Sequence, residues 1–226
     1  MAARFANWEG DIGSAGAALA LRLASGLHAL VLKGIDPHLE AAYPPNNVAN
    51  PVFINAVIGA MTRHDEFLCH WIESASQTNE VGRSGVIITA AHWLHTNFGL
   101  PLKLSELGAS AGLNLLFDKY TLQIGKRYWG SREATVRLTP GWQGNLPPLS
   151  QPHIVERRGV DLSPLRAGHP EDELRLISYI WADQTNRIKR ARAALAFSPP
   201  QVDKADAIEW LPNRLAVPWF GSMHLI

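Results

Sequence analysis

The sequence predicts an α/β protein with a parallel sheet behind an N-terminal helical layer. Two observations lead to this prediction. Apolar residues recur at helical spacing through the first hundred residues, whereas short strand-like runs alternate with helical segments after residue 101. We therefore expect a helical region over residues 1–100 and an α/β core over residues 101–226.

The composition is that of a soluble globular protein with no marked charge bias. The chain has 226 residues, with 21 basic and 20 acidic side chains, so nothing in its net charge favours nucleic acid as a partner. Its longest apolar stretches are interrupted by polar residues, so no membrane span is expected. Cys69 is the single cysteine, which excludes an internal disulfide and fits a cytoplasmic location. The nine histidines show no metal-ligand spacing, so no metal site is predicted.

Three helices are predicted in the N-terminal region. Residues 14–34 have apolar side chains at three- and four-residue spacing, with Ser14 as the expected N-cap and Gly34 as the stop. Residues 51–74 follow a proline- and asparagine-rich loop and have a helical pattern. Residues 84–98 form the third helix, which should end before Gly99.

The α/β core begins with a strand at residues 102–107 and a small-residue loop that leads into a helix. The predicted elements that follow are a hairpin insertion near 119–140, a strand at 153–161, one long amphipathic helix at 170–197 with Trp181 on its inner face, a strand at 201–205, a helical turn at 207–211 and the start of a fourth strand within 215–226.

The loop after the first strand is the strongest candidate for a ligand site. Glycines let a ligand approach the backbone, and a helix N-terminus presents unpaired N–H groups to polar or anionic atoms. A dinucleotide-binding fingerprint needs three glycines, but Ser110 stands at the middle position, which argues against a nicotinamide or flavin cofactor. What remains is Glu106, Gly108, Ser110 and Gly112 in an E-x-G-x-S-x-G pattern. A tight strand-to-helix turn without any ligand would also explain these glycines.

The same loop satisfies a second pattern, G-x-S-x-G, which places a nucleophilic serine on a strained turn in α/β-hydrolases. Ser110 would then be the nucleophile, with Asp161 or Asp206 as the acid and His169 or His224 as the base. Against this interpretation, no HGGG-type oxyanion segment precedes the loop, and the nearby negative charge of Glu106 would oppose an oxyanion.

Two acids follow the later strands at positions where a parallel sheet uses them for binding. Ligands bind outside the carboxyl ends of parallel strands, near the point where the strand order reverses. Asp161 could accept both hydroxyls of a ribose, and Asp206 could accept from an adenine amino group, with Ala207 against the ring. Each acid, taken singly, would also serve as a helix cap or a solvated surface charge.

The pattern around Glu106 resembles the first motif of S-adenosylmethionine-dependent methyltransferases. Longer blocks resemble a bacterial uncharacterised family, domain of unknown function twenty-three thirty-two; they lie at residues 77–84, 106–115, 156–165, 181–184 and 205–207. The resemblance implies a Rossmann-like sheet of the methyltransferase type and S-adenosylmethionine as cofactor. The cofactor-binding residues it implies, together with the acids above, are Glu106, Gly108, Ala109, Ser110, Gly112, Asn114, Asp161, Asp206 and Ala207.

A polar segment before the third helix is expected at the mouth of this site. Asn79, Glu80 and Arg83 could hold a carboxylate of the substrate or of the cofactor. The alternative is structural, with Thr78 or Asn79 capping the helix and Arg83 paired with Glu80 on the surface.

The expected sheet is truncated after its fourth strand, because a methyltransferase core has about seven strands. A second copy of the chain is one candidate to cover the exposed sheet edge. Three functions stay open: an S-adenosylmethionine-binding protein or methyltransferase of unknown acceptor, an α/β-hydrolase using Ser110, and a non-catalytic protein that binds a small-molecule ligand or a partner. Methyl transfer chiefly needs positioning, so no catalytic residue is named.

Overall fold

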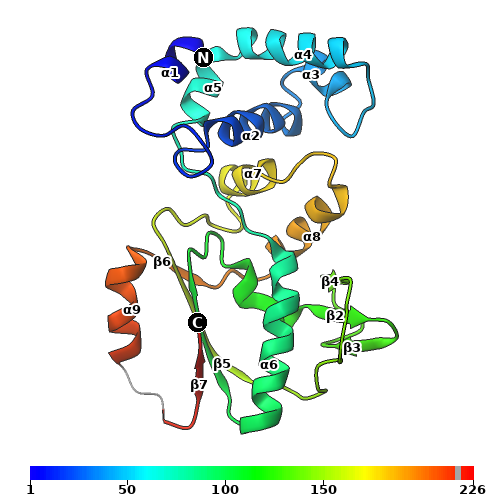
Figure 1. Ribbon diagram of the computed structural model, residues 1–226, viewed down its shortest axis with the longest axis vertical. Coiled ribbons are helices and arrows are strands. Elements are labelled where there is room, and N and C mark those ends of the chain that lie inside the picture. Colours follow the sequence, from blue (N-terminus) through cyan, green and yellow to red (C-terminus); the bar gives the residue numbers. More distant parts are fainter. Residues whose placement is uncertain (217–219) are drawn as a thin grey trace. The chain divides into compact units, whose positions relative to one another are not determined.

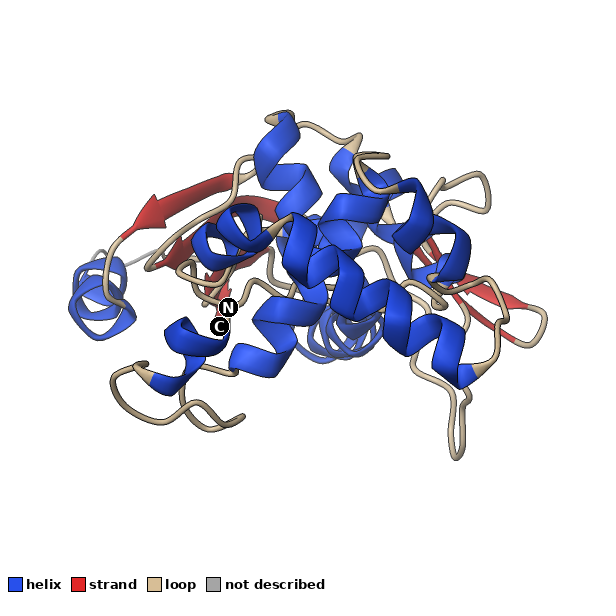
Figure 2. Ribbon diagram, turned by 90° about the horizontal axis from the view of Figure 1, so that it is seen from above, coloured by secondary structure: helices blue, strands red, loops and turns tan. Residues whose placement is uncertain are grey.

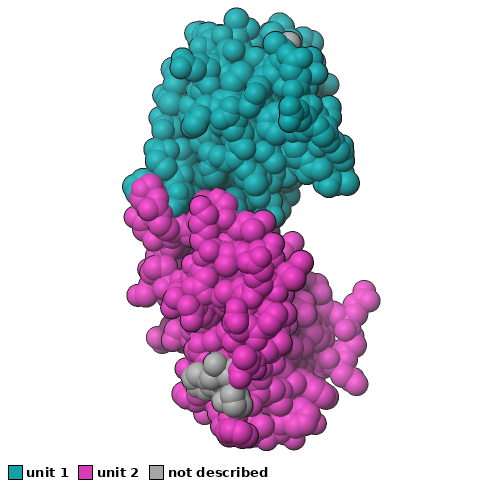
Figure 3. Space-filling model, turned by 90° about the vertical axis from the view of Figure 1, so that its left-hand side faces the viewer, with its two compact units in different colours: residues 1–78, 170–188 teal, residues 79–169, 189–226 magenta. Residues whose placement is uncertain are grey.

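The computed structural model describes residues 1–216 and 220–226, which form two compact units (Figure 3). Unit 1 contains residues 1–78 and 170–188, and unit 2 contains residues 79–169 and 189–226. This division differs from the expected ranges 1–100 and 101–226. The helix at residues 84–98 belongs to the unit that holds the sheet, and the helix beginning at residue 170 belongs to the helical unit.

Unit 1 is built from helices around a small apolar core of Leu27, Leu30, Leu39, Ala60 and Leu68. Burial of these aliphatic side chains drives its folding. Its helices are α1 (Ala2–Ala6), α2 (Leu19–Leu32), α3 (Pro37–Ala42), α4 (Asn50–Arg63), α5 (Asp65–Trp71) and α7 (Pro170–Ser178), and α8 (Thr185–Leu195) begins in this unit (Figure 1).

One buried carboxylate, that of Asp36, ties three helices of unit 1 together. The side chain of Asp36 is 1% exposed, and its Oδ1 caps α3 by accepting from the backbone N–H of Leu39 at 3.0 Å. Its Oδ2 accepts from Arg63 Nη2 at 2.7 Å, at the end of α4. His64 Nε2, between α4 and α5, lies 3.0 Å from the same oxygen. A buried carboxylate with this many donors is well compensated for its lost hydration.

Unit 2 contains a four-stranded parallel sheet with the strand order β6-β5-β1-β7. The strands are β1 (Leu102–Leu107), β5 (Ile154–Asp161), β6 (Gln201–Lys204) and β7 (Met223–Leu225). Because all four are parallel, their carboxyl ends share one edge (Figure 1). The chain proceeds from β1 outward to β5 and β6, then returns to the opposite side of β1, so the strand order reverses between β1 and β7.

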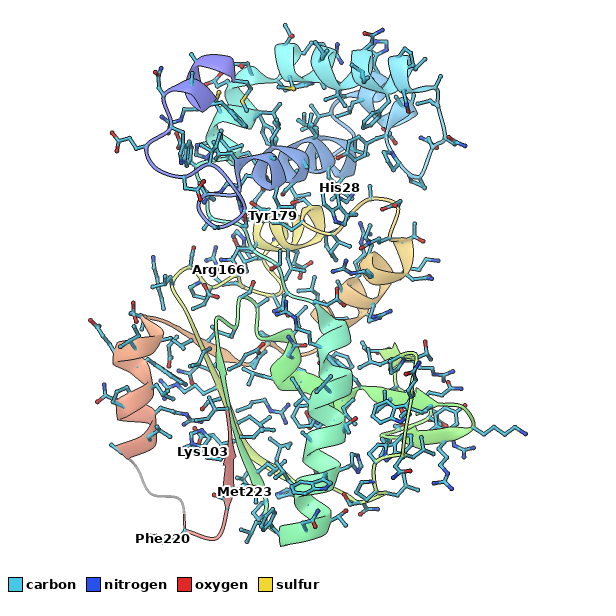
Figure 4. The ribbon with its side chains drawn as sticks, viewed as in Figure 1. His28, Lys103, Arg166, Tyr179, Phe220 and Met223 are labelled. Atoms are coloured by element: carbon cyan, nitrogen blue, oxygen red, sulfur yellow. The ribbon has the colours of Figure 1, made fainter. Side chains whose placement is uncertain are left out.

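The two faces of this sheet differ in polarity. On one side stands α6 (Ser84–Phe98), with η2 (Leu113–Lys119), and on the other stands α9 (Ala207–Ala216) (Figure 1). Lys103 of β1, labelled in Figure 4, is 2% exposed, and its Nζ lies 3.6 Å from Glu156 Oε2. Arg214 of α9 donates to the same carboxylate and, from Nε at 3.0 Å, to Ser105 Oγ. Charged side chains therefore connect α9 to the sheet, and Trp210 Nε1 of α9 also donates to Asp203 Oδ2 of β6 at 2.6 Å.

A smaller sheet lies apart from the parallel one (Figure 2). β2 (Thr121–Ile124) and β3 (Arg127–Trp129) form an antiparallel pair around Gly125, and β4 (Arg137–Leu138) pairs with β2 in parallel. The hairpin expected near residues 119–140 is present, with one additional strand.

Several predicted elements are confirmed, and others differ in extent. The helical turn expected at residues 207–211 is a longer helix, α9, which continues to Ala216. The helix at residues 84–98 and the strand at 102–107 have the predicted bounds. The first helix begins at Leu19 and not after Ser14, with Ala18 as its N-cap. The helix expected at residues 51–74 divides at His64 into α4 and α5, and the sequence has neither glycine nor proline to mark this break.

The prediction of one long helix at residues 170–197 was wrong. Two turns interrupt it, closed by the bonds from Ile180 N to Ile177 O and from Gln184 N to Trp181 O. Trp181 lies at this break and is 54% exposed, so it does not pack inward as the continuous helical pattern indicated. A periodic pattern can carry on across a turn when no residue there forbids a helix, which explains the error.

The expectation for residues 215–226 holds in part. Residues 215 and 216 belong to α9, residues 217–219 lie outside the described residues, and β7 follows at Met223 (Figure 4). No helix within residues 1–216 and 220–226 is both long and apolar enough to cross a membrane.

Candidate functional site

The loop after β1 is built from alternating left-handed residues. Gly108, Ser110 and Gly112 have φ values of 67°, 53° and 71°. Glycine adopts this conformation freely, whereas an L-residue pays about 1 kcal/mol for it. Ser110 therefore stands where the dinucleotide-binding fingerprint has its middle glycine, and it adopts a left-handed conformation that glycine would adopt without strain. Its place in the loop is explained by the bonds that hold it, described below.

The two glycines of the loop have different surroundings. A Cβ on Gly112 would lie 2.6 Å from Pro200 Cγ and 3.0 Å from Val202 Cγ2, so its small size serves packing against β6. A Cβ on Gly108 would meet no atom within 4 Å. Gly108 is thus the glycine at which a ligand could reach the backbone.

A buried amide network joins the loop to the strand and helices around it. Asn114, at 5% exposure, donates from Nδ2 to Glu106 Oε1 at 3.2 Å and to Asn79 Oδ1 at 3.3 Å. Ser84 Oγ donates to Asn114 Oδ1 at 2.9 Å. Asn79 Nδ2 in turn donates to the carbonyl of Ala109 at 2.9 Å. These contacts bring the predicted residues Asn79, Glu106, Ala109 and Asn114 together.

The Glu106 carboxyl group lies at the carboxyl end of β1 in an incompletely hydrogen-bonded position. Burial raises its pKa to about 7, an effect that the hydrogen bond from Asn114 and the positive charge of Arg83 only partly offset. Its Oε2 is buried and has no hydrogen-bond partner within the described part of the chain. A carboxylate in this position would gain from a cationic donor.

A cavity of about 450 Å³ adjoins Glu106. It lies between α6, η2 and the neighbouring strands β1 and β7, where the strand order reverses. Its walls are mainly apolar, and its lining residues are Val86, Ile87, Ala90, Leu104, Ser105, Glu106, Leu107, Asn114, Leu115, Phe117, Leu225 and Ile226.

Asp161 holds the glycine loop in place. Its Oδ2 accepts from the backbone N–H of Ser110 at 2.8 Å, and its Oδ1 accepts from the N–H of Ser163 at 2.8 Å. Leu165 N also donates to the carbonyl of Ser110, at 3.3 Å. Since each carboxylate oxygen has more than one lone pair, these bonds leave acceptor capacity on Asp161.

Asp206 is exposed and begins α9. Its Oδ1 accepts from the N–H of Ile208 at 2.7 Å, which is the bond of a helix cap. Ala207 is half-buried, and the neighbouring Ile208 is 83% exposed. Asp206 therefore caps a helix, as the structural alternative predicted, and the exposed side chain of Ile208 lies two residues further along the chain.

The three predicted residues of the polar segment before α6 have different roles. Glu80, and neither Thr78 nor Asn79, caps η1 (Val81–Arg83), with Oε1 accepting from Gly82 N at 2.8 Å. Glu80 also lies 3.8 Å from Arg190 Nη1. Arg83 is exposed and its charge acts on Glu106. Asn79 and Arg83 thus belong to the surroundings of Glu106, whereas Glu80 makes structural contacts.

Ser84 is a member of the network that the sequence did not single out. It is fully buried at the start of α6, where a polar residue is ordinarily read as a cap. The available signal was that Ser84 directly follows Arg83, a residue predicted to lie at the mouth of the site.

The arrangement around Ser110 does not resemble a hydrolytic triad. Ser110 is 3% exposed, and its Oγ has no hydrogen-bond partner among the described residues. His224, a base considered for this role, pairs in register with Lys103 and lies 2.8 Å from Ser105 Oγ. A base must lie within hydrogen-bond reach of its nucleophile, so this geometry weighs against the hydrolase hypothesis.

Comparisons with known proteins identify a family but no relative of known structure. No curated protein and no solved structure matches the chain. Residues 1–226 match the family described as "Uncharacterized protein conserved in bacteria (DUF2332)". Since the match spans the whole sequence, in agreement with the resemblance found in the sequence blocks, the chain belongs to this family.

Proposed function

We propose that the chain binds S-adenosylmethionine at the carboxyl end of β1 and acts as a methyltransferase. The observation that carries this proposal is the Glu106 carboxyl group, which has a buried oxygen without a hydrogen-bond partner in the described chain and stands before the open backbone of Gly108. The α-ammonium group of the cofactor would supply the missing donor to Glu106. The cofactor supplies a reactive methyl group, and the chain contributes positioning.

The sheet topology supports a Rossmann-like interpretation of the fold. Numbered by their order in the parallel sheet, the four strands run 3-2-1-4, which is the order of the first strands in doubly wound sheets. In such sheets the ligand lies outside the carboxyl ends at the reversal point. Glu106 and the 450 Å³ cavity lie beside that point, between β1 and β7.

The two later acids fit the proposal unequally. Asp206 has one carboxylate oxygen engaged by Ile208 N, and its exposed neighbour Ile208 offers an apolar surface to an adenine ring. Asp161 has both oxygens engaged by backbone N–H groups. A ribose would therefore have to share Asp161 with the Ser110 amide, using the lone pairs that remain.

The decisive measurement is calorimetric titration of the folded chain with S-adenosylmethionine, comparing Gly108→Ala with the parent. We expect the substitution to weaken binding at least tenfold, because the added methyl group would occupy the open space at the backbone. It should also reduce the free energy of unfolding by about 1 kcal/mol, because Gly108 has a φ of 67°.

Gly125→Ala provides a matched control. Gly125 has a φ of 59°, and a Cβ there also meets no atom within 4 Å, so a similar loss of stability is expected without any change in affinity. Absence of binding to the folded parent, or equal affinities for Gly108→Ala and the parent, would contradict the proposal. Binding without methyl transfer to any acceptor would favour the non-catalytic alternative.

A further inference from the structure

A second cavity of unit 2, with a volume of about 510 Å³, lies away from the glycine loop. It is formed by α6, the end of η2, the hairpin and residues 149–152. Pockets of this size accommodate small organic molecules. Aromatic rings and a few polar groups share its lining, which consists of Ile88, His92, Phe117, Asp118, Tyr120, Tyr128, Trp129, Gly130, Leu149, Ser150, Gln151 and Pro152.

His92 presents a hydrogen-bond donor that lacks a partner. The residue is 7% exposed, and its Nδ1 accepts from the backbone N–H of Ser150 at 3.2 Å. Burial, and then the nearby His95, lower the pKa of His92, which favours the neutral ring. A neutral imidazole that accepts at Nδ1 carries its proton on Nε2. Within the described residues this Nε2–H has no hydrogen-bond partner, although the side chain lines the cavity.

The carboxylate that lines the cavity already has cationic partners. Asp118, which lines it, accepts from Arg157 at 2.7 and 3.0 Å and lies 3.7 Å from Lys119 Nζ. Such a bidentate pair leaves little attraction for a further cation, while lone pairs on Asp118 remain able to accept from an uncharged N–H. With His92 neutral as well, the cavity favours an uncharged ligand.

The aromatic residues define the shape of the ligand. Tyr120 and Trp129 use their own polar atoms elsewhere, since Tyr120 Oη donates to Leu113 O at 2.6 Å and Trp129 Nε1 donates to Pro148 O at 2.9 Å. Tyr120 and Trp129 are each 1% exposed and Phe117 is 3% exposed, so their rings expose little surface to the cavity, and the half-buried Tyr128 offers more. Aromatic walls pack favourably against flat rings.

We propose that this cavity binds an uncharged, planar heteroaromatic molecule that accepts a hydrogen bond from His92 Nε2–H and donates one to Asp118. The proposal does not depend on S-adenosylmethionine binding: Phe117 lines both cavities, but His92 and Asp118 belong neither to the glycine loop nor to its amide network and do not line the cavity beside Glu106. Titration with the cofactor tests that other function separately.

Hypoxanthine and indole are suitable probes for ligand-observed NMR titration. Both are flat two-ring molecules with an N–H donor, but hypoxanthine also has a carbonyl acceptor. We expect the parent to bind hypoxanthine about tenfold more tightly than indole, which is the worth of one hydrogen bond.

His92→Asn is the informative variant. The asparagine Oδ1 can replace Nδ1 as acceptor for Ser150 N–H, whereas the donor at the Nε2 position is lost. This variant should bind the two probes with equal affinity. His92→Gln, whose terminal amide can restore the donor, should recover the preference for hypoxanthine. His70→Asn is the matched control, because His70 is 85% exposed on the other unit, and it should behave as the parent.

A readout that needs no variant completes the test. Long-range ¹H–¹⁵N spectra of the parent should show His92 as the Nε2–H tautomer, and saturating hypoxanthine should shift its Nε2 resonance. If the parent binds neither probe, if His92→Asn retains the preference, or if the Nε2 resonance does not move, the proposal is overturned.

Discussion

Replacing Glu106 with glutamine is expected to stabilise the chain at pH 8 while removing the contact proposed for the ammonium group of S-adenosylmethionine. Burial raises the pKa of Glu106 to about 7 from an ordinary value of 4.5. Below pH 4.5 the group is protonated in the folded and unfolded states alike, so it has no effect on stability. Between pH 4.5 and pH 7 Glu106 loses its proton more readily in the unfolded state, so the free energy of unfolding decreases as the pH rises. Above pH 7 the full free-energy cost of the buried carboxylate is present.

The size of this effect is on the order of 3 kcal/mol at pH 8, because one pKa unit corresponds to about 1.4 kcal/mol. Glutamine keeps an acceptor for Asn114 and carries no charge at any pH. The free energy of unfolding of Glu106→Gln should therefore exceed that of the parent at pH 8 and match it near pH 4.5. Urea denaturation at both pH values measures this difference, and equal stabilities at pH 8 would contradict it.

The same variant should lose affinity for ligands that carry an amino acid. We expect S-adenosylhomocysteine to bind Glu106→Gln about 30-fold more weakly than the parent at pH 8, the worth of a charge-assisted hydrogen bond. In the parent its affinity should rise as the pH increases through 7, because the ionised carboxylate binds the ammonium group. 5′-Methylthioadenosine, which lacks the amino-acid part, is the control ligand and should bind both proteins equally. If Glu106→Gln weakened the binding of 5′-methylthioadenosine more than that of S-adenosylhomocysteine, the result would argue against Glu106 as the ammonium acceptor.

Asp36→Ala is expected to cost about 3 kcal/mol in the free energy of unfolding of unit 1. The substitution removes the cap of α3 and leaves Arg63 and His64 without their shared acceptor. Chemical denaturation followed by circular dichroism measures the loss. Glu66→Ala, at an exposed position in the first turn of α5, should change stability by less than about 0.5 kcal/mol.

The Asp36 contribution should also depend on pH in a defined direction. Burial alone would raise the pKa of Asp36, but hydrogen bonds from Leu39, Arg63 and His64 outweigh it and lower the pKa below 3.8. Its stabilising effect is therefore present above the unfolded value and is lost as the pH falls through the folded one. The stability gap between the parent and Asp36→Asn should narrow below pH 3.8. A gap that stays constant with pH would exclude the charge of Asp36 as its source.

The sequence was most informative where local chemistry decides the structure. Gly99, in a left-handed C-cap, ended α6 at the predicted residue, and the alternation of apolar residues placed β1 correctly. The glycine loop was recognised because glycines at residues 108 and 112 follow a predicted strand and precede a predicted helix, and both adopt the left-handed conformation that glycine allows. Such signals depend on neighbouring residues alone, so a single sequence contains them.

Features that depend on long-range contacts were not accessible in the same way. Nothing near Ser84 indicates that its hydroxyl meets Asn114, which lies 30 residues further along the chain. The cavity around His92 likewise requires Ser150, 58 residues away, to occupy Nδ1 and leave Nε2 as the donor. The role of Asp161 could not be predicted for the same reason, because its bond to the Ser110 amide forms only when β5 pairs with β1.

The attachment of α9 by charged groups bears on where a protease would first cut unit 2. No residue of α9 is buried, and Arg214 is the side chain that joins it to Glu156, Ser105 and the carbonyl of Leu104. Elements with little buried apolar surface open at the least cost in free energy. Limited digestion should therefore begin within this helix, and ionic strength should change the cleavage rate little, because the Arg214 side chain is 8% exposed and partly buried ion pairs are only weakly screened.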